Sequence, residues 1–383
     1  MNAKKNKYML RGVLKKNGYD WWWHSFTGYN KSNGEPKTFF IEYFVVNPAL
    51  SPQKIVFGQK KDKKSLIKDT APIKPCYVMI KAGVWGKDAK QIHAFYPTEK
   101  LVIKKHDFSL SAGCCTLSET YISGAVAMPE KEAVAHPEYM SDAGSMAWKL
   151  KVNKKITFDV GYGTSWLFRK MNIFQMYWHA QGVKTEYTGS VVYDGQEYVV
   201  PPEKSYGYAD KNWGTDFTSP WIWLSSCNLV SQISGDRLEN ACFDIGGGCP
   251  KVCGFPLNRK VLAFFHFDGK NYQFNFSHFW KKSKVEFSFN EEGELLHWFV
   301  SAENHSMLLD VDVYCRREDS LFINYEAPSG QKNFDRLWNC GNGYGELKFF
   351  RKKRKALELV EDAKIYNCGC EYGEYKDTAQ NKK

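Results

Sequence analysis

Residues 205–223 read SYGYADKNWGTDFTSPWIW and place a carboxyl, an amine and an amide side by side at Asp210, Lys211 and Asn212. The surrounding tyrosines and tryptophans favour burial, and buried polar groups must satisfy one another or a ligand. A few polar groups in an aromatic setting are typical of a site for an apolar substrate with one reactive centre. A strand end with a solvated Asp–Lys pair and a structural tryptophan is the alternative interpretation.

A second acidic group precedes tryptophans at Asp20, which is followed by Trp21, Trp22 and Trp23. A carboxyl enclosed by indoles is expected to have a raised pKa, because burial disfavours the charged form. Such a group stays protonated near neutral pH and can act as a general acid. Aromatic faces could then stabilise a cation formed by protonating an alkene, each by about 0.5–2 kcal/mol. The alternative is that both aspartates bond backbone amides at strand ends, with Lys211 neutralising one of them.

Other catalytic and metal-binding patterns are weak in this sequence. The triple glycine 246–248 lacks the Lys-Ser/Thr and the helix of a nucleotide loop, and no Gly-x-Ser-x-Gly elbow occurs. His24 and His179, on aromatic segments, are more typical of hydrogen-bonded core residues than of catalysts. The spacings of Cys249 with Cys253 and of Cys368 with Cys370 do not form a standard zinc set, so we predict no metal site.

The 383-residue chain has 43% hydrophobic, 25% charged and 16% aromatic residues, a globular composition whose aromatic excess favours β structure. Its eleven cysteines, the lack of an N-terminal leader and the lack of a long apolar run predict a cytoplasmic protein with free thiols. The net charge of +11 gathers partly in Lys-rich stretches at the N-terminus and at 60–68, where we expect solvated faces.

A third basic stretch differs from these two, because it could contact an anionic membrane surface. It consists of Arg351, Lys352, Lys353, Arg354 and Lys355. No known nucleic-acid motif accompanies it, so we predict no nucleic-acid partner.

Short strands recur along the chain without helical patterns between them, which indicates an antiparallel barrel or sandwich. Asp194-Gly195 and Asp268-Gly269 lie between alternating apolar runs and predict tight hairpins, and Glu291-Glu292-Gly293 predicts a third. Only residues 355–363 have a helical pattern. Because Asp20 and Asp210 each precede tryptophans and a run of strands, we predict two barrel-like halves.

Residues 205–214 and 220–229 resemble the Lys-Asn-Trp-Gly signature of tocopherol cyclases and the Trp-x-Trp strand that follows it, which ends in Cys-Asn. Further stretches agree in order, so that the resemblance spans about residues 19–350: YDWWW at 19–23, NP at 47–48, IGGG at 245–248, HFDGK at 266–270, AEN at 302–304 and CGNGYGELK at 340–348. The YDWWW opening also resembles that of the wider superfamily of carotenoid hydratases and other lipocalin-like proteins.

The resemblance implies an all-β fold of two lipocalin-like antiparallel β-barrels with little helix. We place the barrels at residues 17–202 and 203–366, followed by a tail at 367–383. It also implies cofactor-free, acid-catalysed chemistry on an isoprenoid or prenylated aromatic ligand held in a long apolar cavity. In a cyclase, a phenol oxygen captures the cation; in a hydratase, water does. A non-catalytic lipid carrier is the third possibility.

The resemblance makes Asp210 the proton donor, with Lys211 and Asn212 orienting it and Asp20 as the second choice of acid. The implied substrate-binding residues are Trp22, Trp23, Trp178, His179, Tyr208, Trp213, Trp221, Trp223, Tyr344 and Glu346. Asp20 and Asp210 stand where we expect glutamates in the plant enzymes, and no plastid transit segment precedes the motif. We therefore expect a bacterial relative whose specific reaction is open.

Overall fold

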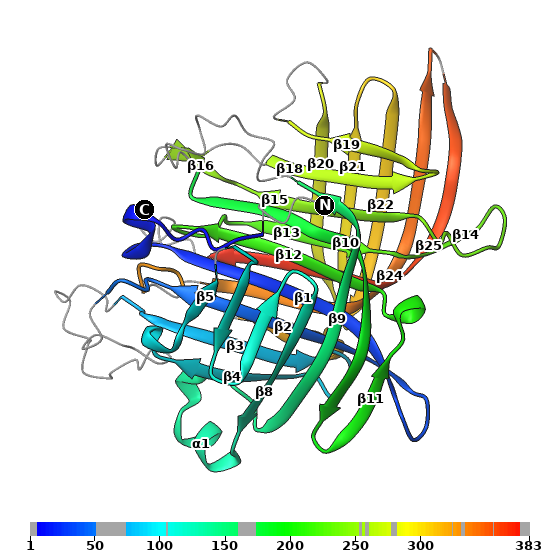
Figure 1. Ribbon diagram of the computed structural model, residues 1–383. Helices are drawn as coiled ribbons and strands as arrows, with labels where there is room; N and C mark the ends of the chain where they lie inside the picture. Colours follow the sequence, from blue (N-terminus) through cyan, green and yellow to red (C-terminus); the bar gives the residue numbers. More distant parts are fainter. Residues whose placement is uncertain are drawn as a thin grey trace.

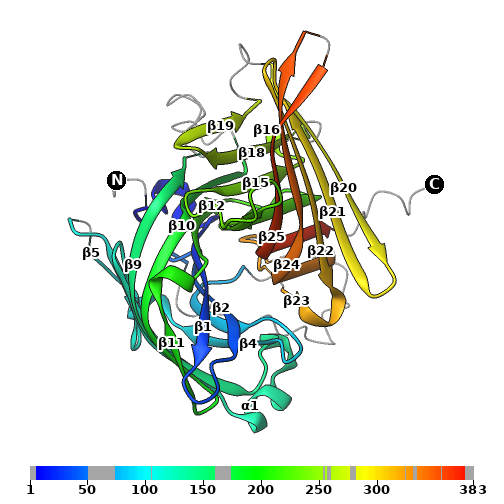
Figure 2. The same ribbon diagram turned by 90° about the vertical axis from the view of Figure 1, so that its right-hand side faces the viewer.

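The computed structural model describes residues 6–50, 74–104, 106–159, 174–252, 255–256, 260–276, 282–323, 325–330, 334–354 and 356–375. The basic stretch at 60–68 and Cys253 lie outside these residues. Most of the described chain forms two large antiparallel sheets that curve beside each other (Figures 1 and 2). The expected all-β fold of two barrel-like halves with little helix is confirmed.

The first sheet runs in the order β4-β3-β2-β1-β11-β10-β9-β8-β7-β6-β5, and β12 pairs with both β1 and β10. It curls until β4 packs against β8. Its strands are β1 (Tyr19–Asn30), β2 (Pro36–Val46), β3 (Tyr77–Val84), β4 (Lys90–Tyr96), β5 (Val102–Lys104), β6 (Ser109–Ala112), β7 (Cys115–Ser118), β8 (Tyr121–Met128), β9 (Gly144–Phe158), β10 (Met176–Tyr193), β11 (Gln196–Val200) and β12 (Gly207–Gly214).

The second sheet runs in the order β19-β18-β15-β13-β25-β24-β22-β21-β20, with β14 on β25 and β23 on β24. Its strands are β13 (Trp221–Ser226), β14 (Asn228–Ser231), β15 (Cys242–Gly248), β18 (Lys260–Phe267), β19 (Lys270–Phe274), β20 (Lys284–Glu292), β21 (Leu295–Glu303), β22 (Met307–Arg316), β23 (Leu321–Phe322), β24 (Phe334–Lys353) and β25 (Ala356–Tyr375). The pair β16 (Lys251–Val252) and β17 (Phe255–Pro256) stands apart. The helices are short: α1 (Glu130–Ala135), η2 (Gly12–Lys15), η4 (Thr98–Lys100), η5 (Pro137–Tyr139), η7 (Pro202–Lys204) and η9 (Arg317–Asp319).

Three hydrophobic cores result: one inside each curved sheet and one between the two sheets. Successive side chains of a strand point to opposite faces. In β1, Trp22 and Phe26 therefore enter the first core, whereas Trp21 and Trp23 enter the core between the sheets. β1 is therefore buried on both faces, in agreement with the nearly continuous aromatic run at its start.

The N-terminal segment helps to fill the first core. Leu10 and Leu14 are buried there, and the Trp22 indole donates to the Asn6 carbonyl at 2.8 Å. The interior of the first sheet is therefore occupied by the protein's own side chains.

The three hairpins are confirmed, and at the first two the Asp and Gly both have positive φ: Asp194 and Gly195 join β10 to β11, and Asp268 and Gly269 join β18 to β19. The helix expected at 355–363 is wrong, because residues 356–363 belong to β25 and pair with β24.

The chain changes sheet between Gly214 and Trp221, so β12 belongs to the first sheet, and β25 continues into the residues assigned to a tail. Within the described part of the chain, no helix has the length and apolar character needed to cross a membrane.

Candidate active site between the two sheets

A cavity of about 160 Å³ lies between the two sheets, within the third core. Strands of both sheets line it, and its wall is mainly aromatic. The tryptophans of the wall are Trp21, Trp23, Trp178, Trp221 and Trp223. The glycines 246–248 of β15 also contribute; a Cβ at Gly246 would lie 2.9 Å from the Trp178 ring, so only glycine leaves the indole in place. The cavity therefore lies outside both curved sheets, at their junction.

Asp210 presents its carboxyl group to this cavity from β12. Its Oδ2 accepts the Trp178 indole N–H at 2.8 Å, and its Oδ1 accepts the Trp21 indole N–H at 3.3 Å. The Tyr208 hydroxyl lies 3.4 Å from Oδ2. Among the described residues, these three contacts come from uncharged donors, so the carboxyl group is held in place without an ion pair.

Burial of Asp210 raises its pKa to about 7, although the indole N–H groups of Trp178 and Trp21 oppose the shift. The nearby carboxylates of Glu371 and Glu42 raise the pKa further. Both protonation states of Asp210 are therefore populated near neutral pH, which is the condition that a general acid needs.

Asp244, on β15, is a buried acid that the sequence reasoning missed. Its Oδ2 lies 3.5 Å from the Tyr208 hydroxyl, and its Oδ1 accepts the Trp223 indole N–H at 3.2 Å. Burial, followed by the negative charge of Asp210, holds the pKa of Asp244 well above its usual range. Tyr208 thus bridges two carboxyl groups that come from different sheets. A charged residue inside the apolar strand 242–248 was the available signal.

Glu371, on β25, is a second carboxyl of the cavity wall that the sequence reasoning missed. It accepts hydrogen bonds from the Trp221 indole at 2.5 Å, the Tyr325 hydroxyl at 2.8 Å and the Asn339 amide at 2.6 Å. These three bonds of 2.5–2.8 Å are shorter on the whole than the three contacts of Asp210 at 2.8–3.4 Å, so Glu371 is tied into the wall more tightly.

Lys211 and Asp20 lie on the other face of their strands. Lys211 forms a fully buried ion pair with Asp20, and its Nζ lies 3.6 Å from the centre of the Trp22 ring. Burial raises the pKa of Asp20 to about 6 and lowers that of Lys211 to about 8, against their mutual attraction. The pair is therefore ionised at neutral pH, and the structure does not bring either residue into the cavity.

The remaining candidate residues divide into three groups. Asn212, Trp23, Trp178, Trp221 and Trp223 line the cavity, and Tyr208 lies just behind Asp210. Trp22, His179 and Trp213 lie on the side of Lys211; the His179 Nε2 is 2.9 Å from the Asn6 side-chain oxygen. Tyr344 is 44% exposed, and Glu346 pairs with Lys348 at the surface. The structure does not bring these last two residues to the cavity.

A protein-family model described as tocopherol cyclase-like matches residues 80–374. Three solved structures are similar in shape. A Nitrosomonas europaea protein assigned as AttH has 10% identity, covers 93% of this chain and 91% of its own, and gives a TM-score of 0.49. Kievitone hydratase from Nectria haematococca has 11% identity, 97% coverage of each chain and a TM-score of 0.46. CghA with Sch210972 has 10% identity, covers 94% of this chain and 89% of its own, and gives a TM-score of 0.46. No curated protein sequence matches the chain.

Proposed function

The chain belongs to the tocopherol cyclase-like family, and on this premise we propose that it protonates a double bond of an isoprenoid substrate and closes a ring by intramolecular capture of the cation. One observation carries the proposal. Asp210 is a buried carboxyl on an aromatic cavity wall, its contacts are uncharged donors, and burial raises its pKa to about 7.

In the proposed reaction, the Asp210 carboxyl group transfers its proton to one alkene carbon, and the π electrons form the new C–H bond. The other carbon becomes a tertiary cation. A phenol oxygen of the same substrate forms a C–O bond to that carbon and loses its proton, which restores the protonated acid. The substrate is isomerised, and no atom is gained or lost.

The indole rings of the wall can stabilise the cation that the proton transfer creates. A cation beside an aromatic face gains about 0.5–2 kcal/mol per ring. Trp21 and Trp178 hold Asp210 through their N–H edges, so their rings stand next to the point of proton transfer. The aromatic wall also excludes water that would otherwise trap the cation early.

Tyr208 and Asp244 form a proton store behind Asp210. The Tyr208 hydroxyl lies 3.4 Å from Asp210 Oδ2 and 3.5 Å from Asp244 Oδ2. Once Asp210 has given its proton to the alkene, a protonated Asp244 can pass its proton to the Tyr208 oxygen while the Tyr208 hydroxyl passes its own to Asp210, and the proton released by the capturing oxygen makes good the one lost by Asp244. A proton can therefore return to Asp210 through this hydroxyl after each turnover.

The size of the cavity is compatible with the reacting end of a substrate. Its volume of about 160 Å³ is close to the roughly 150 Å³ of a cavity that holds a benzene molecule. One isoprenoid unit near a carboxyl group fits this space, so the remainder of a longer substrate would have to lie outside it.

Hydration of the same cation is the second candidate reaction, because a polar side chain stands beside the acid. Asn212 faces the cavity two residues after Asp210, and its amide oxygen accepts the Tyr19 hydroxyl at 2.6 Å. This bond fixes the amide plane, so that Asn212 is suited to orient a water molecule. Product mass separates the outcomes, since hydration adds one water and cyclisation adds nothing.

The test uses Asp210→Asn beside Glu371→Gln, the matching change at the other cavity carboxyl. A geranylated hydroquinone is incubated with each protein in deuterium oxide, and the products are examined by mass spectrometry. We expect the wild type to incorporate one carbon-bound deuterium and Asp210→Asn to lose about 10²–10⁴-fold in rate. Unchanged turnover by folded Asp210→Asn would exclude Asp210 as the acid. Retention of the isoprenoid without product by every protein would indicate a carrier.

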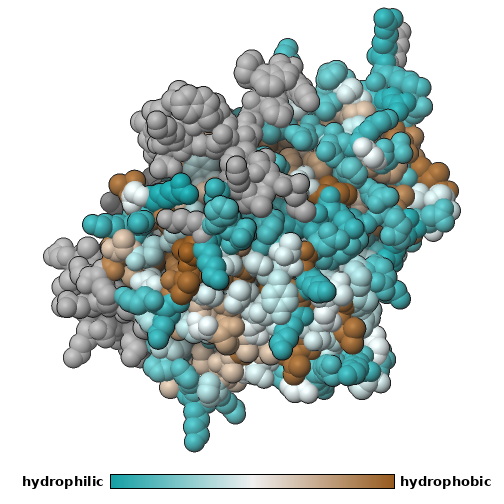
Figure 3. Space-filling model, in the orientation of Figure 1, coloured by the Kyte–Doolittle hydropathy of each residue, from teal (hydrophilic) through white to brown (hydrophobic). Residues whose placement is uncertain are grey.

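We also propose that the β24–β25 hairpin contacts a membrane from which an apolar substrate is drawn. The hairpin extends beyond the body of the molecule, and hydrophilic side chains cover its projecting end (Figures 1 and 3). Leu357 and Leu359 are 52% and 44% exposed beside the basic residues 351–354. Arg351 and Lys353 pair with Glu358, and Lys352 pairs with Glu303, so the basic charge is partly offset. Lys355 lies outside the described residues.

A further inference from the structure

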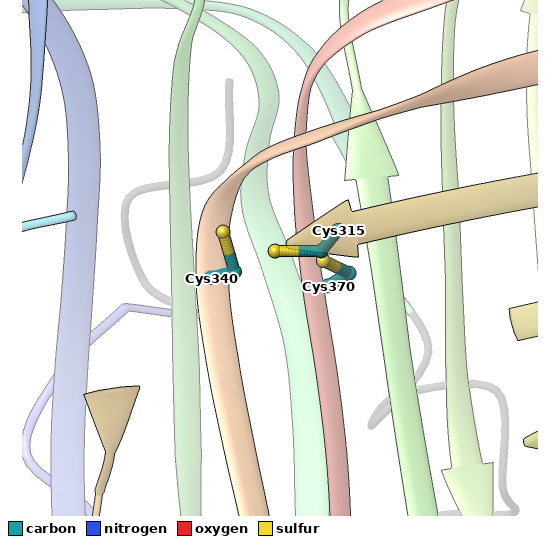
Figure 4. A group of neighbouring side chains, drawn as sticks. All are labelled: Cys315, Cys340 and Cys370. Atoms are coloured by element: carbon teal, nitrogen blue, oxygen red, sulfur yellow. The ribbon is translucent and has the colours of Figure 1, made fainter. Parts of the chain in front are cut away.

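Three buried cysteines converge inside the second sheet. Cys315, Cys340 and Cys370 come from the neighbouring strands β22, β24 and β25, and each is fully buried. Their sulfur atoms all lie within 4.8 Å of one another. Figure 4 shows the three side chains turned toward a common space. Cys340 and Cys370 are also direct cross-strand partners.

The spacing of the sulfur atoms is close to that of a metal site. A Zn–S bond is about 2.3 Å long, which places the sulfur atoms of a trigonal or tetrahedral site about 3.8–4.0 Å apart. The upper limit of 4.8 Å therefore requires a contraction of less than about 1 Å, within the reach of a side-chain rotation.

The backbone beside Cys340 is shaped around its sulfur. The pairing of β24 with β25 is irregular between Cys340 and Gly343, and the Asn342 N–H donates to the Cys340 sulfur at 3.2 Å. Bulges of this kind re-aim groups near functional sites. At Gly343, a Cβ would lie 3.1 Å from the Cys370 sulfur, so the glycine keeps the space beside that sulfur open. Backbone donors to ligand atoms are the outer contacts that orient and tune metal ligands.

We propose that Cys315, Cys340 and Cys370 bind one soft metal ion of the Zn²⁺ class. Thiolates select zinc and similar soft ions over magnesium or calcium. The positive charge of the ion compensates for the burial of thiolate charge, and the Asn342 N–H adds to this compensation. The proposal of this metal site does not depend on the proposed reaction, because it is based on the three thiols and the backbone around them alone.

The bound ion would tie together the strands that form one wall of the cavity. Asn339 directly precedes Cys340 in β24, and Glu371 directly follows Cys370 in β25. Because neighbouring residues of a strand point to opposite faces, Asn339 and Glu371 point away from the cysteines and line the cavity. They are cross-strand partners, joined by a hydrogen bond of 2.6 Å. A metal bridge from β22 to β24 and β25 would therefore fix the register of this wall from behind.

The competing interpretation is that three core thiols merely pack together, since free cysteine behaves as a small apolar residue. The two interpretations differ in ligand count. Reduced, metal-free protein is titrated with Cd²⁺ under anaerobic conditions, with the thiolate-to-cadmium absorption band followed, and the loaded sample is examined by X-ray absorption. We expect one ion per chain and a first shell of three sulfur atoms.

Cys340→Ser and Cys370→Ser should lose this band, whereas Cys242→Ser, at another fully buried cysteine, should keep it. Cd²⁺ should also raise the melting temperature of the wild type and of Cys242→Ser. A wild-type shell without sulfur, or equal binding by wild type and Cys340→Ser, would overturn the proposal. The X-ray absorption measurement needs only the wild type, so the proposal remains testable if a serine variant does not fold.

Discussion

The Tyr208 hydroxyl lies between two buried aspartates from different sheets, at 3.4 Å from Asp210 Oδ2 and 3.5 Å from Asp244 Oδ2. Burial raises the pKa of both acids, and the negative charge of Asp210 raises the pKa of Asp244 further. This bridge exists only because the two sheets pack together, so the proposed proton chemistry depends on the junction between them.

Tyr208→Phe removes the bridging hydroxyl but keeps the aromatic ring. We expect steady-state turnover to fall about tenfold, less than the about 10²–10⁴-fold effect of a group that transfers the proton directly, because Asp210 only regains its proton more slowly. The first protonation, measured in a single turnover, should be nearly unchanged. An equal loss in both measurements would instead make Tyr208 a residue that positions the Asp210 carboxyl group.

Activity should be high at low pH and fall as the pH rises through about 7. Asp210 has a raised pKa of about 7, and the protonated form is the donor. Below the pKa the acid is mostly protonated, and above it the protonated fraction drops about tenfold per pH unit. The pH profile of kcat/KM for a prenylated phenol measures this. A rate that increases through the same range would require the carboxylate as a base.

Trp178→Phe should move the midpoint of this pH profile in a defined direction. The Trp178 N–H stabilises the Asp210 carboxylate and so lowers its pKa. Its removal should move the descending limb of the profile to higher pH. Trp221→Phe removes an N–H that is bonded to Glu371, and should leave the midpoint close to that of the wild type.

Asp20→Asn should act on stability, since the Asp20–Lys211 pair is buried away from the cavity. Removal of one partner leaves an unpaired buried charge, which typically costs about 3–5 kcal/mol of unfolding free energy. Asp20→Asn/Lys211→Met removes both charges and should recover part of this loss in denaturant unfolding. Full stability of Asp20→Asn together with abolished turnover would identify Asp20 as the acid instead.

The β24–β25 hairpin can be tested with vesicles that contain anionic lipid. We expect salt-sensitive binding that weakens in a variant with residues 351–354 changed to glutamine and in Leu357→Ser/Leu359→Ser. Equal binding by these variants and the wild type would remove the hairpin from the membrane contact.

Local signals predicted much of the fold. Asp194-Gly195 and Asp268-Gly269 form the expected turns because their geometry depends on neighbouring residues alone. Residues 356–363 contain good helix formers, yet they form a strand because pairing with β24 outweighs their intrinsic preference.

The site was only partly predictable from the sequence. Strand alternation already separates Asp210 and Asn212 from Lys211, and this signal was available in the sequence. Asp244 and Glu371 could not be placed in this way, because their distance from Asp210 is set by how the two sheets pack. The domain limits stay a prediction, although the chain changes sheet after Gly214 rather than at 203.

The most direct test of the central claim is the infrared spectrum of the protein, recorded against Asp210→Asn as the pH is raised. The account predicts a carbonyl band of a protonated carboxylic acid that is present in the wild type below about pH 7, disappears as the pH rises through that value, and is missing from the variant. Carboxylate absorption from Asp210 throughout the range, with no band lost in Asp210→Asn, would contradict the claim that this residue carries the proton.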